Sequence, residues 1–220
     1  VMETGAHNLR FSVPTGNFGN IYAAHVMRRC GLPMGGLIIA SNRNDILTRF
    51  FETGVMQVSD VEPSLSPSMD IQISSNFERL LSEVMTPKEL GLFMQAFRDT
   101  GTAQLDGDAM QALRAAFTAC RCDDATTLST IRATHDKNGM TLDPHSAVGV
   151  HAALQSGPDP THPIMAMACA HPAKFPDAIK QAIGTPPPQP EVLAKLFTKE
   201  ERYTRLPADY QAVQSFIEGL

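Results

Sequence analysis

The stretch Ser12–Asn20, SVPTGNFGN, contains the residues best suited to binding an anion. Gly16 and Gly19 allow the backbone to adopt positive φ and to approach a ligand closely. Successive backbone N–H groups in such a turn can converge on one anion, and the N-terminus of a helix that follows adds positive partial charge. The threonine and the two asparagines of the stretch offer further donors. The pattern therefore predicts a site for a phosphate dianion.

The alternative interpretation is a tight strand-to-helix turn that binds nothing, because short loops of glycine and asparagine are common. The stretch matches neither G-x-x-x-x-G-K-[ST] nor G-x-G-x-x-G. A nucleotide is therefore not the ligand that this loop favours.

The elements that must position this loop follow from the hydrophobic pattern. Short apolar runs predict strands at Phe11–Val13, Gly36–Ser41, Asp70–Ser74 and Pro163–Ala170. Helix-like patterns lie between and after them, at Ile21–Cys30, Asn44–Glu52, Asn76–Met85, Pro87–Arg98, Asp108–Cys120, Asp123–Asn138, Ser146–Gln155 and Ala173–Ile183. Several of the apolar runs lack polar alternation, as strands covered on both faces do. The alternation predicts an α/β fold with a mainly parallel sheet and flanking helices.

Helix starts and domain limits can also be predicted. Asn42 or Asn44 can cap the second helix, and Thr86 precedes a proline at a first helical position. The middle third shows no obvious strand, so we expect a helical subdomain at about 86–140 within a domain over 1–184. The proline-rich segment 185–191 is the predicted linker, and 192–220 is expected to form terminal helices.

The composition limits the partners. The chain has 220 residues and a net charge of −5, with no dense block of lysine and arginine, which argues against a nucleic-acid partner. No apolar run approaches the roughly 20 residues of a membrane span, and the first residues lack the layout of a secretory signal. We therefore expect a cytoplasmic protein that does not enter a membrane.

The cysteines point to no metal or redox site. The close pair Cys120 and Cys122 has a spacing that suits neither a redox motif nor a zinc knuckle, and His135 completes no common pattern with it. We expect no metal. The four cysteines, with Cys30 and Cys169, are predicted to be buried, reduced thiols.

Five ordered blocks resemble threonine synthases, enzymes of fold type II that depend on pyridoxal 5′-phosphate. They are FSVPTGNFGN (11–20), ASNRNDILTRFFETG (40–54), SPSMDIQISSNFERLL (66–81), LDPHSAVGVHAAL (142–154) and ACAHPAKF (168–175). The blocks span most of the chain, so the resemblance is specific. It implies the C-terminal part of such an enzyme's large domain.

The resemblance implies a set of cofactor-binding residues. The phosphate loop corresponds to Gly16, Asn17, Phe18, Gly19 and Asn20. The family's last strand places a small hydroxyl residue, usually threonine, against the pyridine nitrogen. Cys169 occupies that position here, and a thiol is the weaker hydrogen-bonding group. A small residue on a covered strand is the alternative interpretation of Cys169.

Other polar residues support two interpretations each. Asn76 and Arg79 could face a substrate, since Arg79 offers a fork-shaped donor for carboxylate or phosphate, but a helix cap with a surface ion pair fits them as well. The DPH and AHPAKF stretches, with His145 and Lys174, invite a catalytic interpretation. A helix cap or a packed imidazole is the commoner role, and His145 suits a helix start.

The family's Schiff-base lysine belongs to a Ser-Phe-Lys-Asp-like motif that this sequence lacks, and in the family it lies before the phosphate loop. The resemblance therefore implies no catalytic residue in this chain, a lysine located before Val1, and an inactive piece without the N-terminal half of the polypeptide. The complete enzyme converts O-phospho-L-homoserine and water to L-threonine and phosphate. Another phospholyase that uses the same cofactor, or a non-catalytic domain that binds phosphate or a partner subunit, is the alternative.

Overall fold

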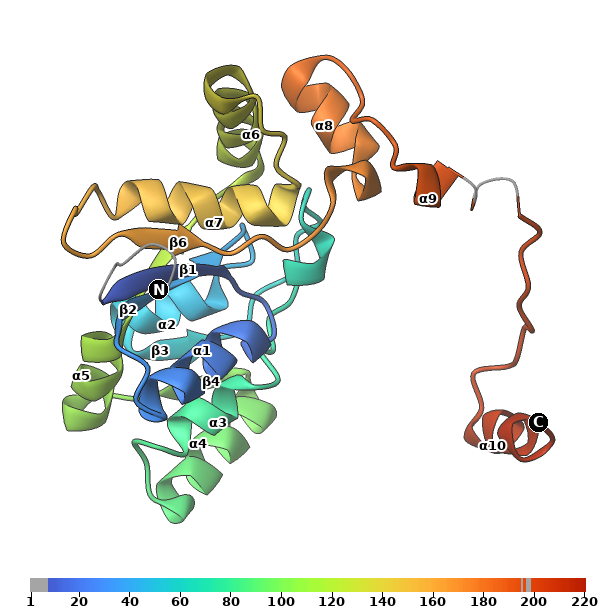
Figure 1. Ribbon diagram of the computed structural model, residues 1–220. Helices are drawn as coiled ribbons and strands as arrows, with labels where there is room; N and C mark the ends of the chain where they lie inside the picture. Colours follow the sequence, from blue (N-terminus) through green and yellow to red (C-terminus); the bar gives the residue numbers. More distant parts are fainter. Residues whose placement is uncertain (1–7, 195, 197–198) are drawn as a thin grey trace. The chain divides into compact units, whose positions relative to one another are not determined.

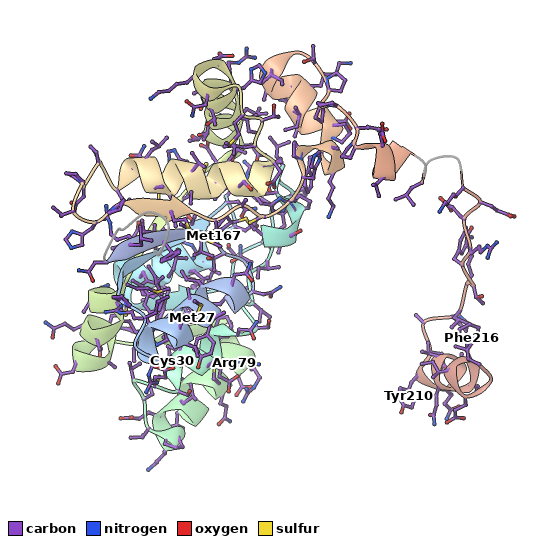
Figure 2. All side chains as sticks on the ribbon, viewed as in Figure 1. Met27, Cys30, Arg79, Met167, Tyr210 and Phe216 are labelled. Carbon is purple, nitrogen blue, oxygen red and sulfur yellow. The ribbon has the colours of Figure 1, made fainter. Side chains whose placement is uncertain are left out.

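The structure, a computed structural model, describes residues 8–194, 196 and 199–220. The chain divides into two compact units, one ending at Pro187 and the other running from Pro188 to Leu220. The second unit contains α9 (Glu191–Ala194) and α10 (Tyr210–Glu218). Tyr210 and Ile217 of α10 are largely exposed, and Tyr210 is labelled in Figure 2. The candidate site lies entirely in the first unit.

A four-stranded parallel sheet forms the centre of the first unit. Its strands are β1 (Leu9–Pro14), β2 (Met34–Ser41), β5 (Phe117–Arg121) and β6 (Ile164–Ala166), in the order β5-β2-β1-β6. This arrangement confirms the predicted α/β fold. Because β2 and β6 flank β1 on opposite sides, the chain leaves β1 where the strand order reverses, which is where open α/β sheets bind ligands.

Both faces of the sheet are covered by helices. On β2, Leu37 and Ile39 belong to the large hydrophobic core, whereas Ile38 and Ala40 pack with Val148 in a smaller core on the other face. The helix α7 (Pro144–Gln155) lies along that second face (Figure 1). The remaining helices of this unit are α1 (Gly19–Arg29), α2 (Ile46–Thr53), α3 (Phe77–Leu81), α4 (Pro87–Thr100), α5 (Gly107–Ala116), α6 (Asp124–Asn138) and α8 (Pro176–Ile183).

The expectation of a middle third without strands was wrong. The helix predicted at Asp108–Cys120 ends at Ala116, and the chain continues directly as β5, in which Phe117 pairs with Leu37 and is buried in the core. Two short strands, β3 (Val55–Gln57) and β4 (Thr102–Gln104), form an antiparallel pair beyond the main sheet. Pairing partners distant in the sequence create these strands, so local periodicity could not reveal them.

The strand predicted at Asp70–Ser74 was also wrong, because this segment runs in an irregular path after a 3₁₀ turn at Pro67–Met69. Side chains replace sheet partners there. The Asp70 carboxylate accepts hydrogen bonds from Asn42 Nδ2 at 2.7 Å and Asn44 Nδ2 at 3.0 Å. The side-chain oxygens of Asn42 and Asn44 accept from the backbone N–H groups of Asn44 and Glu62, so neither side chain caps α2, whose N-cap residue is Asp45.

Other local predictions were confirmed or need smaller corrections. Thr86 caps α4 in a full capping box with Glu89. Cys30 and Cys169 are exposed rather than buried, while Cys122 is buried. Among the described residues, no helix is both long enough and apolar enough to span a bilayer.

Candidate functional site

The loop between β1 and α1 has a conformation different from the one that its glycines predict. Positive φ falls on Phe18, at 62°, and neither Gly16 nor Gly19 has it. Gly16 is needed for close approach instead, because a Cβ there would lie 3.0 Å from the Ser68 carbonyl oxygen and 3.2 Å from Met69 Cα. Both neighbours are backbone atoms, so they cannot yield easily.

The side chain of Phe18 holds the loop to the core. Its ring is fully buried, and its centroid lies 5.0 Å from that of Phe77 in an edge-on arrangement. A residue other than glycine in the left-handed region costs about 1–3 kcal/mol, and burial of an aromatic ring can offset that cost. The core thus supports the strained residue that turns the loop into α1.

Two carbonyl groups of the loop, those of Gly16 and Asn17, are hydrogen-bonded to the segment before α3. Ser74 Oγ donates to the Gly16 carbonyl at 2.8 Å, and Asn76 donates to the Asn17 carbonyl from Nδ2 at 2.8 Å and from its backbone N–H at 3.1 Å. Within the described part of the chain, no acceptor is found for the N–H groups of residues 16–19. The loop therefore has N–H donors that are free among the described residues, whereas its Gly16 and Asn17 carbonyls already accept hydrogen bonds.

The threonine of the loop does not serve as a donor to a ligand. Thr15 is buried, and its hydroxyl donates to the Val13 carbonyl at 2.6 Å. The expected contribution of this hydroxyl was wrong because a nearer backbone acceptor takes its proton. Asn17 and Asn20 keep their side-chain amides at the loop surface, where Asn17 Oδ1 accepts a bond from Ser75 Oγ at 3.3 Å.

A cavity of about 380 Å³ opens at the carboxyl ends of β1 and β6. It is lined by residues 14–21, by Ser68 and Met69, and by His145, Cys169, Ala170, Lys174 and Phe175. All six residues predicted to bind the cofactor, Gly16 to Asn20 and Cys169, therefore line one cavity. Asn76 lies behind the loop as its brace. Arg79 is exposed on α3 and does not line the cavity (Figure 2).

Cys169 follows β6 and is held through its backbone, whose N–H donates to Ser146 Oγ at 2.9 Å. Cys169 keeps exposed surface at the cavity, yet burial, with a smaller effect of the Asp143 charge, raises the pKa of its thiol to about 11. At neutral pH the group is therefore a protonated thiol and can act only as a weak donor or acceptor.

Asp143 connects the start of α7 to the segment after β6. As N-cap of α7, its side chain accepts from the backbone N–H groups of His145 and Ser146, from the Ser146 hydroxyl, and from the Ala170 N–H at 3.2 Å. His145 Nδ1 adds a contact of 3.0 Å. Because the N–H groups of residues 169 and 170 turn toward Ser146 and Asp143, β6 ends at Ala166 rather than continuing to the predicted Ala170.

Sequence reasoning did not place His145, Lys174, Ser68 or Met69 at the cavity. The DPH stretch did carry a signal, since a capping Asp before a proline marks a helix start and fixes the following imidazole. Nothing local marked Ser68 and Met69, whose position depends on the Asp70 hydrogen bonds to distant asparagines. In residues 8–194, 196 and 199–220 no group of three or more His, Cys, Asp or Glu side chains could hold a metal ion.

Comparisons with known proteins agree on one family. Residues 146–217 match the family described as threonine synthase, C-terminal. Threonine synthase of Pseudomonas aeruginosa is 42% identical over 98% of the chain, and that of Saccharomyces cerevisiae is 34% identical over 96%. The chain spans 47% and 46% of these relatives, about half their length.

Solved structures give the same result. The structure of pyridoxal-phosphate-bound threonine synthase from Brucella melitensis matches 99% of this chain with a TM-score of 0.93 and 41% identity, and the chain covers 48% of it. Yeast threonine synthase matches 96% of the chain with a TM-score of 0.87 and 34% identity, and the chain covers 47% of it. In both kinds of comparison the chain covers about half of the relative's length.

Proposed function

We propose that this chain, whose sequence and fold are those of the C-terminal half of threonine synthases, forms the phosphate side of a pyridoxal 5′-phosphate site. The observation that supports this most directly is the loop of residues 16–19, whose carbonyls are bonded to Ser74 and Asn76 while its N–H groups are left free at a cavity. Such a loop at a helix N-terminus suits a phosphate dianion.

The other cavity residues fit the rest of the cofactor. Cys169, which follows β6, lines the same cavity at the position where the resemblance places the partner of the pyridine nitrogen, and its protonated thiol suits a neutral ring nitrogen. When bound, pyridoxal phosphate acts as an electron sink for carbanions at the substrate's amino-acid carbon atoms. In this chain the amides hold the phosphate, and Phe18 anchors the loop to the core so that the ring keeps a fixed orientation.

For the complete enzyme we propose the threonine synthase reaction, which the names of its relatives indicate. O-phospho-L-homoserine loses its γ-phosphate, water adds at the β carbon, and L-threonine and inorganic phosphate are released. Asn76 and Arg79 stay predicted substrate contacts. Asn76 is hydrogen-bonded to the loop, and Arg79 is exposed on α3. Neither residue lines the cavity, so the predicted substrate contacts would lie outside its wall.

We also propose that the chain alone is inactive. Among the lysines that the structure describes, Lys174 lines the cavity, and the others, Lys88, Lys137, Lys180 and Lys199, are exposed elsewhere. The family's Schiff-base lysine lies in the portion that precedes the phosphate loop, so the N-terminal half of the enzyme is the partner that this site requires.

The test is a calorimetric titration of the chain with pyridoxal phosphate, repeated in the presence of inorganic phosphate. We expect one cofactor per chain, competition by phosphate, and no release of phosphate from O-phospho-L-homoserine. Asn20→Asp places a negative charge beside the loop amides and should weaken binding by about tenfold or more. Asn138→Asp, on the exposed end of α6, is the matched control and should bind normally. Absence of saturable binding, or equal loss in both variants, would refute the phosphate site.

A further inference from the structure

His145 is a buried histidine with one ring nitrogen engaged and the other free. The residue is 4% exposed, and its Nδ1 lies 3.0 Å from Asp143 Oδ1. Its Nε2 is buried and has no hydrogen-bond partner among the described residues, although the side chain lines the cavity. A buried polar atom without a partner costs about 1–3 kcal/mol, which points to a bound group that completes it.

The imidazole of His145, at the cavity wall, is contacted from two sides. Asp143 fixes Nδ1, and the ring of Phe175 packs at 5.0 Å between centroids. One turn further along α7, Gly149 is so close to Pro14, the last residue of β1, that a Cβ would lie 2.9 Å from Pro14 Cγ. The first turn of α7 therefore lies at the end of β1 from which the phosphate loop leaves, and His145 belongs to that turn.

Asp143 determines what this imidazole can offer. Burial alone would raise the pKa of the Asp143 carboxyl, but the hydrogen bonds from His145, Ser146 and the Ala170 N–H lower it below its usual value. The carboxylate is therefore ionised at neutral pH and can only accept, so the Nδ1–H of His145 donates to it. An oxyanion beside the buried Nε2, which has no partner among the described residues, would complete the ring by accepting a charge-assisted hydrogen bond from Nε2–H.

The remaining polar groups of the cavity favour an anionic partner for that donor. Residues 16–19, whose N–H groups have no acceptor among the described residues, line the same cavity as Lys174, and the Gly16 and Asn17 carbonyls are already hydrogen-bonded. The Cys169 thiol is protonated at neutral pH because burial raises its pKa to about 11. The charged side chains here are thus the Asp143 carboxylate, bonded to His145, and the side chain of Lys174, which lines the same cavity.

We propose that His145 is a further phosphate-binding residue, which donates from Nε2 to the oxyanion held by the loop of residues 16–19, with Asp143 as its positioning residue. This inference rests on the proposed function, because the oxyanion is the phosphate of the cofactor. It makes the start of α7 a second anchor for the phosphate, on the opposite side of β1 from α1.

The experiment measures the affinity of the chain for inorganic phosphate and for pyridoxal phosphate by calorimetry. His145→Ala should weaken both by about tenfold or more, since a hydrogen bond to a charged group is lost. His145→Gln, which retains a neutral donor, should recover part of the loss. His135→Ala, at the partly exposed end of α6, is the control and should leave both affinities unchanged.

A second measurement needs no variant. Long-range ¹H–¹⁵N spectra of the histidine rings should show a His145 Nε2 signal that moves when inorganic phosphate saturates the site. Loss of pyridoxal phosphate affinity with unchanged phosphate affinity would assign His145 to the ring instead and overturn the inference. Unchanged affinities for both compounds would also overturn the inference, as would a His145 Nε2 signal that does not move when phosphate is added. If the wild-type chain binds neither compound, the proposed function itself fails, and this inference fails with it.

Discussion

Asn76 Nδ2 donates a hydrogen bond of 2.8 Å to the carbonyl oxygen of Asn17 and so connects the start of α3 to the loop between β1 and α1. The backbone N–H of Asn76 reaches the same oxygen at 3.1 Å. One residue thus occupies the Asn17 carbonyl twice, while the N–H groups of residues 16–19 have no acceptor among the described residues.

Replacement of Asn76 should therefore weaken ligand binding without direct contact. We expect Asn76→Ala to lower the affinity for pyridoxal phosphate by roughly threefold to tenfold, since one neutral hydrogen bond of about 0.5–1.5 kcal/mol is lost and the backbone bond persists. Fluorescence titration measures the change, with Asn138→Ala on α6 as control. An unchanged affinity would show that the hydrogen bond from the Asn76 backbone N–H is enough to hold the loop in its conformation.

Gly16 and Gly91 allow a matched pair of alanine substitutions. Gly16→Ala should destabilise the protein by about 1–3 kcal/mol and weaken phosphate binding, because the new Cβ meets backbone atoms of Ser68 and Met69. Gly91 lies within α4, where an added Cβ would meet no atom of another element within 4 Å, so Gly91→Ala should stabilise by about 0.5–1 kcal/mol. Urea unfolding separates the two, and equal effects would contradict the close approach at Gly16.

Asp143 should make stability depend on pH in the acid range. The folded-state pKa lies below the ordinary value of about 3.9, so the carboxylate's contribution is complete above that value and is lost as pH falls through the folded-state pKa. Asp143→Asn should cost about 1–3 kcal/mol at pH 7, and the difference from wild type should shrink on acidification below about pH 4. Urea unfolding at several pH values measures it. Asp136→Asn, at an exposed carboxyl, should show no comparable loss.

Cys169 should react slowly with alkylating reagents at neutral pH. Because burial raises the pKa of its thiol to about 11, the reactive thiolate is scarce, and its fraction grows about tenfold per pH unit until that pKa is reached. Mass spectrometry of iodoacetamide-treated protein at pH 7 to 10 follows this dependence. Bound pyridoxal phosphate should slow the reaction further. Rapid alkylation at pH 7 would contradict the raised pKa of the Cys169 thiol.

The sequence predicted the parts of the site that lie within one continuous stretch. The turn after β1, the helix that follows it and the cap of α7 depend on neighbouring residues, and each was found near its predicted place. The sign of φ was assigned to the wrong residues, because the glycines suggested flexibility whereas burial of the Phe18 ring determines which residue turns.

The parts that failed depend on partners far along the chain. The sequence pattern of Phe117–Arg121 predicted the end of a helix. The segment is instead a strand, because it pairs with β2. Ser68 and Met69 reach the cavity because Asp70 is bound by Asn42 and Asn44, more than twenty residues away. No pattern in a short window contains such information.

The enclosed Phe18 ring has a thermodynamic consequence for ligand capture. A loop of glycine and asparagine would ordinarily lose much conformational freedom when it closes around a ligand. Here folding of the core has already restricted that freedom, since the ring cannot leave its place beside Phe77 without opening the hydrophobic interior. Phosphate should therefore meet a preorganised receptor, and the entropic penalty of association should be small.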